Sequence, residues 1–104
     1  MVLKIEFFIT DDCPFWKDAL HILEDVLNLY NIRASIEQII IKTEEDAIKN
    51  KFIGSPTIRI NGEDVDPGAK FVTNYAPTCC RVYFYKGKKW DYPPREQIID
   101  FLKA

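Results

Sequence analysis

Three cysteines are the residues of this 104-residue chain whose chemistry stands out: Cys13, and the adjacent pair Cys79 and Cys80. A thiolate attacks disulfides and binds soft metals. No leader-like apolar segment opens the chain, so we expect a cytoplasmic protein. Thiols are normally reduced there, and the count is odd, which argues against a disulfide framework. Reactive or metal-binding thiols are therefore the chemistry to consider.

Cys13 is the candidate catalytic residue. It follows Thr10-Asp11-Asp12, a break with helix-capping chemistry, and precedes Pro14, which suits the first turn of a helix. A thiol at the start of a helix lies near unpaired backbone N–H groups, whose partial positive charge favours the thiolate. The alternative is a partly buried, inert cysteine.

Cys79 and Cys80 have three interpretations. They are a structural pair at the start of a strand with side chains on opposite faces, a resolving thiol for Cys13, or a vicinal dithiol that binds soft metals or oxidises. Geometry opposes the second, since we expect the start of this strand at the far end of the sheet from Cys13. One histidine, His21, and separated thiols give no zinc-ligand spacing, so we expect no metal site and no cofactor.

Alternating and helical apolar patterns predict the elements that position these residues. Residues 2–9 alternate Leu3, Ile5, Phe7 and Ile9 on one face and form a strand, and the run Ile39-Ile40-Ile41 suits a strand covered on both faces. The predicted elements in order are a strand 2–9, a helix 15–30, a strand 34–41, a helix 44–51, a strand 57–60, an irregular connection 63–80, a strand 81–85 and a helix after Pro93-Pro94. This β-α-β-α-β-β-α order predicts one α/β domain over residues 1–104, a four-stranded mixed sheet with helices on both faces.

Two motifs in this order resemble the thioredoxin fold in its compact, glutaredoxin-like form. Cys13-Pro14-Phe15-Trp16 stands where that fold keeps its redox cysteine, and Gly54-Ser55-Pro56-Thr57 stands where it keeps a cis-proline. The chain is most similar to small bacterial thioredoxin-like proteins with a lone CPxW cysteine and a GSPT loop. The resemblance implies a cis-Pro56 beside Cys13 and a Ser55 backbone free to pair with an extended substrate. It further implies substrate contacts from Ser55, Thr57, Phe15 and Trp16; for the two aromatic residues, core packing is the alternative.

One departure from the family pattern shapes the functional prediction. Trp16 occupies the position of the second cysteine of thioredoxins, so the usual internal disulfide cannot form. The resemblance then implies a monothiol thiol–disulfide oxidoreductase that forms mixed disulfides with a protein or small-molecule thiol at Cys13. A non-catalytic protein-binding module and a soft-metal (mercury or arsenic) thiol-binding protein are the alternatives.

Charge and apolar patterning limit the partners. The net charge of -2 gives no basic excess for nucleic acid, and no apolar run approaches the ~20 residues that span a bilayer. We therefore expect neither nucleic acid nor membrane as a partner. A second apolar stripe on the first helix, Phe15, Ile22 and Leu29, can mark a homodimer or partner surface.

Overall fold

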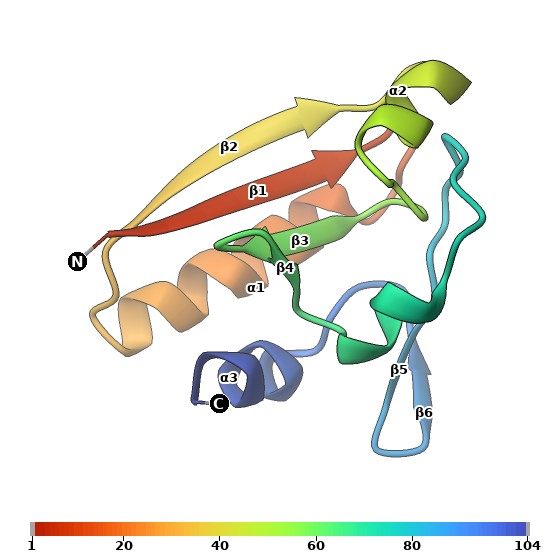
Figure 1. The fold of residues 1–104 in the computed structure, drawn as a ribbon. Coiled ribbons are helices and arrows are strands. Elements are labelled where there is room, and N and C mark those ends of the chain that lie inside the picture. Colours follow the sequence, from red (N-terminus) through yellow and green to blue (C-terminus); the bar gives the residue numbers. More distant parts are fainter. Residues whose placement is uncertain (1, 104) are drawn as a thin grey trace.

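The apolar alternation near the N-terminus forms the central strand of a sheet. In the computed structural model, which describes residues 2–103, β1 (Leu3–Ile9) pairs parallel with β2 (Ala34–Ile40) and antiparallel with β3 (Thr57–Ile60). A short β4 (Glu63–Asp64) follows β3 across an Asn-Gly turn, and the sheet order is β2-β1-β3-β4 (Figure 1). The α/β class and the four-stranded mixed sheet are confirmed, an arrangement compatible with a thioredoxin-like fold.

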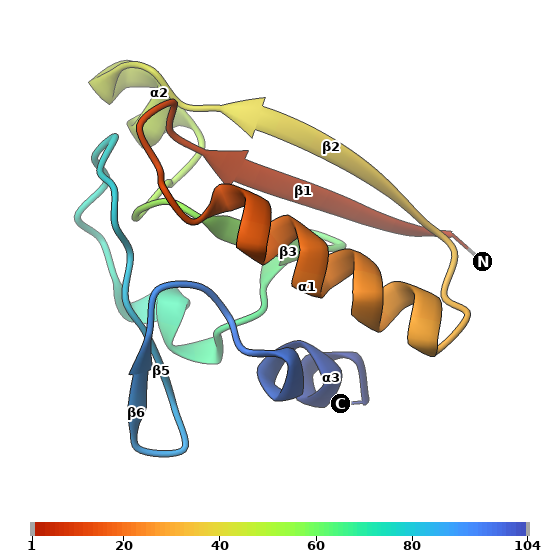
Figure 2. The same ribbon diagram turned by 180° about the vertical axis from the view of Figure 1, so that it is seen from behind.

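Helices cover the sheet on two sides. The helices α1 (Trp16–Leu29) and α3 (Arg95–Lys103) pack against one face, where Ile5, Phe7 and Ile9 are buried. Figure 2 shows α1 running along this face with α3 beside its C-terminal half. The short α2 (Glu44–Lys49) contributes Ala47 to a smaller cluster around Phe8 on the opposite face. The alternation of β1 therefore separates two apolar clusters.

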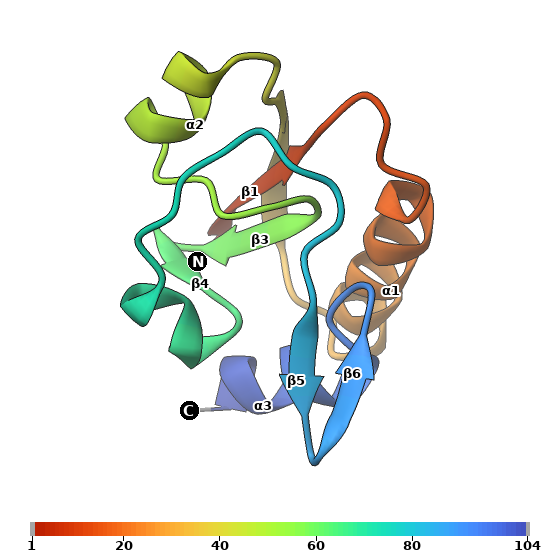
Figure 3. The same cartoon turned by 90° about the vertical axis from the view of Figure 1, so that its right-hand side faces the viewer.

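The fourth strand of the sheet differs from the prediction. It is β4, because the chain turns back at once after β3, whereas residues 81–85 lie outside this sheet. Within them β5 (Tyr83–Tyr85) pairs only with β6 (Lys88–Trp90) in a separate hairpin (Figure 3). Between β4 and β5 the chain forms a single 3-10 helix, η1 (Pro67–Phe71), and then an extended segment.

The prediction that the second strand is covered on both faces is also wrong. β2 is an edge strand, and Ile40 is 42% exposed. The apolar run 39–41 continues past the end of β2, because Ile41 is buried in the Phe8 cluster, to which α2 contributes Ala47. No helix within residues 2–103 is long and apolar enough to cross a membrane.

Candidate functional site

Cys13 lies in the turn that connects β1 to α1. Its backbone N–H donates to the carbonyl oxygen of Thr10 at 3.2 Å, and its side chain is a free thiol that is only 4% exposed. The helix begins at Trp16 with Phe15 as its N-cap, and no side chain caps it. The predicted capping by the Thr10-Asp11-Asp12 break is therefore wrong, because this break forms a turn of its own before the helix.

The loop before β3 is fastened to this turn. Ser55 is fully buried, and its Oγ accepts a hydrogen bond from the Thr10 backbone N–H at 3.1 Å. The Ser55–Pro56 peptide bond is cis, as the resemblance implied. Thr57 is also buried and donates from Oγ1 to the Gly54 carbonyl oxygen at 2.6 Å. The turn that contains Cys13 and the Gly54–Thr57 loop are thus joined through Thr10 at one end of the sheet.

The two aromatic residues of the CPxW motif pack against other side chains of the protein. Trp16 is partly buried and packs against the main apolar cluster. Phe15 is partly buried and its ring lies 6.2 Å from that of Tyr92, centroid to centroid. These contacts favour the core interpretation for both side chains over substrate contact.

The segment from Thr78 to Arg81 lies along Ser55. The Ser55 N–H donates to the Thr78 carbonyl oxygen at 2.9 Å, and the Arg81 N–H donates to the Ser55 carbonyl oxygen at 2.9 Å. These bonds form an isolated parallel bridge between Ser55 and Cys79. In Figure 3 the chain after η1 climbs past the start of β3 before it descends into β5. The expectation of a free Ser55 backbone is therefore wrong, because the chain's own segment takes both of its polar groups.

Cys79 and Cys80 form a vicinal disulfide across a cis peptide bond. Their side chains therefore do not point to opposite faces of a strand, and neither residue belongs to β5. The predicted position at the far end of the sheet is also wrong, since the irregular connection folds back to the Ser55 loop. Cys79 is half-buried and Cys80 is exposed. The oxidised vicinal pair agrees with the third interpretation of these two residues.

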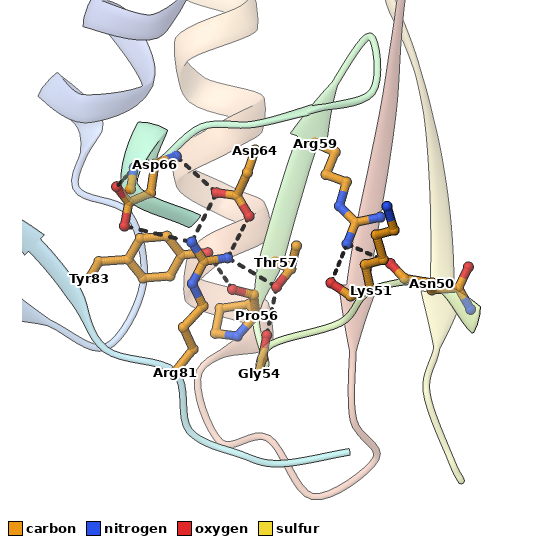
Figure 4. Close-up of polar contacts among 11 residues, drawn as sticks. Asn50, Lys51, Gly54, Pro56, Thr57, Arg59, Asp64, Asp66, Arg81 and Tyr83 are labelled. Carbon is orange, nitrogen blue, oxygen red and sulfur yellow. Dashed lines mark hydrogen bonds and ion pairs between the residues drawn. The ribbon is translucent and has the colours of Figure 1, made fainter. Parts of the chain in front are cut away.

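Arg81 anchors this segment (Figure 4). Its guanidinium donates to both carboxylate oxygens of Asp64, at 2.7 and 2.9 Å, and to Thr57 Oγ1 at 3.1 Å. Asp66 adds an ion pair at 3.7 Å, and the guanidinium lies 4.1 Å from the centre of the Tyr83 ring. Sequence reasoning missed this cluster; a lone basic residue at the start of the apolar run 81–85 was the available signal.

Burial shapes the electrostatics of the same cluster. Burial alone lowers the pKa of Arg81, but the negative charge that Tyr83 carries when ionised, together with the hydrogen bond and charge of Asp64, outweighs burial and raises this pKa. Burial raises the pKa of Tyr83 far above its ordinary value, although the charge of Arg81 partly opposes this. The Tyr83 hydroxyl donates to the Pro56 carbonyl oxygen at 2.5 Å. A neutral Tyr83 and a charged Arg81 therefore hold the segment and the proline loop together.

A family comparison places the chain in a wider group. The model of the family described as domain of unknown function DUF2703 matches residues 15–101. The chain belongs to this family. No curated protein and no solved structure matches its sequence.

The cysteines of this DUF2703 protein do not line the cavity beside η1. A cavity of about 710 Å³ lies between the β3–β4 turn and η1, lined by Lys51, Arg59, Asp64, Lys70 and Tyr75 among others, and no cysteine lines it. Within the described residues, no three His, Cys, Asp or Glu side chains gather as ligands for a metal ion. The two segments that bond to the Ser55 loop carry the reactive groups of this region: the buried thiol of Cys13 and the Cys79–Cys80 disulfide.

Proposed function

We propose that this protein is a thioredoxin-like thiol–disulfide oxidoreductase that acts through Cys13. The observation that carries the proposal is that the turn with a free thiol and the segment with a disulfide both bond to the same cis-proline loop, at Ser55. Thioredoxin-like membership itself rests on the motifs and on the compatible α/β architecture. Thiol–disulfide exchange is the chemistry that these groups have in common.

In the proposed reaction, the Cys13 thiolate attacks one sulfur of a disulfide. A new bond forms between Cys13 Sγ and that sulfur, the old S–S bond breaks, and the departing thiolate takes the proton that Cys13 lost. A second, external thiol then attacks the mixed disulfide and returns Cys13 to its reduced form. Each step exchanges one S–S bond for another, and the external thiol supplies the electrons.

Two neighbours of Cys13 are suited to support this exchange. Ser55 and cis-Pro56 fix the loop against which a strand pairs. The Thr10 hydroxyl is buried, lies in the same turn as Cys13, and has no hydrogen-bond partner among residues 2–103. Since a buried hydroxyl without a partner is costly, it is available to donate to a thiolate formed in this turn.

The burial of Cys13 restricts its partners. A side chain that is 4% exposed cannot meet a disulfide on a large folded protein unless the surrounding segment moves. The disulfide must be small, or it must already lie beside Cys13.

A turnover assay tests the proposal. Glutathione reduces hydroxyethyl disulfide slowly by itself, and we expect the wild-type protein to accelerate this reaction. Cys13→Ser should reduce the rate to that of the uncatalysed reaction, because the nucleophile is lost. Asp12→Ser is the matched control, because it introduces a serine at the exposed residue next to Cys13 in the same turn. It should retain the wild-type rate.

The folded state of each variant is checked by urea unfolding. A wild-type protein without acceleration, or a folded Cys13→Ser protein with the full rate, would contradict the proposal. The second outcome would favour a non-catalytic binding role for the fold.

A further inference from the structure

The segment from Thr78 to Arg81 occupies the place of a substrate strand. It takes the N–H and the carbonyl oxygen of Ser55, the two backbone groups expected to bind an extended substrate. The residue that this pairing brings opposite Ser55 is Cys79. The chain therefore presents its own disulfide to the loop that adjoins Cys13.

Hydrogen bonds connect the two cysteine-bearing segments through a short path. The Cys13 N–H bonds to Thr10, the Thr10 N–H bonds to Ser55 Oγ, and the Ser55 backbone pairs with the segment that contains Cys79. Both cysteine-bearing segments therefore bond to the buried Ser55, the Cys13 turn through Thr10 and the Cys79 segment through its backbone.

Exposure increases along the three cysteines from Cys13 to Cys80. Cys13 is buried, Cys79 is half-buried, and Cys80 is exposed. An external thiol or disulfide meets Cys80 first, whereas Cys13 has a neighbour of its own chain.

We propose that Cys79–Cys80 is the internal exchange partner of Cys13, so that the protein works with three thiols and Cys79 is its resolving residue. This inference rests on the proposed function. The Cys13 thiolate attacks Cys79 Sγ, a Cys13–Cys79 disulfide forms, and the Cys79–Cys80 bond breaks. Cys80 leaves as a thiolate and takes up the proton that Cys13 released. The step is redox-neutral, with one disulfide and one thiol before and after.

The exchange moves the free thiol from a buried position to an exposed one. Cys80 then attacks an external small-molecule disulfide, forms a mixed disulfide with one half and releases the other half as a thiol. A low-molecular-weight thiol supplies the electrons that return Cys80 to its reduced form. The anchored Arg81, next to Cys80 in the chain, keeps the segment in register on Ser55 during these steps.

Two single variants test the inference. Cys80→Ser retains Cys13 and Cys79, and Cys79→Ser retains Cys13 and Cys80. Each variant is reduced, then oxidised with diamide at low protein concentration, and the monomer is digested without reductant for peptide mass spectrometry. We expect the Cys13–Cys79 link in Cys80→Ser to form at least about tenfold faster than the Cys13–Cys80 link in Cys79→Ser, because the fold positions Cys79.

The unfolded chain provides the matched reference. The two links close loops that differ by one residue, so in 8 M urea, a denaturing concentration, the two rates should agree within about twofold. A preference for Cys79 in buffer that disappears in urea supports the inference. Equal rates in buffer, or no Cys13–Cys79 link, would overturn it.

The turnover assay separates this result from the proposed function. Cys13-dependent turnover in a protein that forms no Cys13–Cys79 link would retain the oxidoreductase and overturn the internal partner. A Cys13–Cys79 link in a protein without turnover would overturn the oxidoreductase and leave the internal exchange itself supported.

Discussion

Arg81 fastens the disulfide segment to the sheet, and Arg81→Met is the substitution that tests this anchor. Methionine retains much of the apolar length but removes the charge and all donors. The Arg81 side chain is 5% exposed and that of Asp64 is 13% exposed, so solvent screens the pair poorly. The variant leaves the Asp64 carboxylate without its two charged hydrogen bonds.

The size of the effect follows from this burial. Breaking a buried ion pair by removing one partner costs about 3–5 kcal/mol of unfolding free energy. For a urea m-value of about 1.5 kcal/mol/M, this loss lowers the unfolding midpoint by roughly 2–3 M. Arg81→Lys should lose less, because it retains the charge but not the two-pronged contact with Asp64.

Equilibrium unfolding in urea, without reductant, measures the loss. The matched control is Arg95→Met, which breaks an ion pair with Asp25 whose side chains are 54% and 62% exposed; it should cost less than about 1 kcal/mol. In a double-mutant cycle with Asp64→Asn, the two losses should fall short of additivity by more than about 1 kcal/mol. Additive losses, or an Arg81→Met loss no larger than that of the control, would refute the reasoning.

Three further substitutions probe the supporting structure. Tyr83 keeps its proton in the folded state above pH 10, where the unfolded chain loses it, so stability falls with rising pH by about 1.4 kcal/mol per pH unit for this group. Tyr83→Phe should make the alkaline fall in the unfolding free energy, measured in urea, shallower by that amount, and an unchanged slope would contradict the raised pKa of Tyr83. Gly54→Ala places a Cβ 2.9 Å from the Arg81 Cβ at a φ of +141°, whereas Gly62→Ala at φ +86° meets nothing within 4 Å. Gly54→Ala should therefore lower the thermal midpoint further, and equal losses would contradict the close approach. Thr43→Ala removes the side-chain cap of α2 and should cost about 0.5–2 kcal/mol in urea unfolding, with no effect if the cap is not formed in solution.

Local patterns in the sequence were sufficient for much of the fold. The alternation of Leu3, Ile5, Phe7 and Ile9 correctly predicts β1 and its buried face, because a strand with one apolar face has few other ways to bury it. The Thr43 start of α2 also follows from local chemistry, since its side chain bonds the Asp46 N–H.

The candidate site depended on contacts that no local pattern encodes. Residues 63–80 have no regular period, so the sequence gives no signal that they fold back onto Ser55. Placing residues 81–85 in the main sheet put Cys79 at the wrong end, and this error argued against Cys79 as a partner of Cys13. The cluster of Arg81 with Asp64 joins residues far apart in the chain, and only the tertiary structure reveals it.

If Cys13 and the vicinal pair exchange disulfides at the Ser55 loop, the single free thiol of the oxidised wild-type monomer must move between Cys13 and Cys80. Timed alkylation of this monomer, followed by peptide mass spectrometry without reductant, locates the free thiol most directly. We expect alkylation at both Cys13 and Cys80, because internal exchange releases Cys80, and no Cys80 labelling in folded Cys13→Ser. Labelling confined to Cys13, with the Cys79–Cys80 disulfide intact throughout, would rule out the exchange.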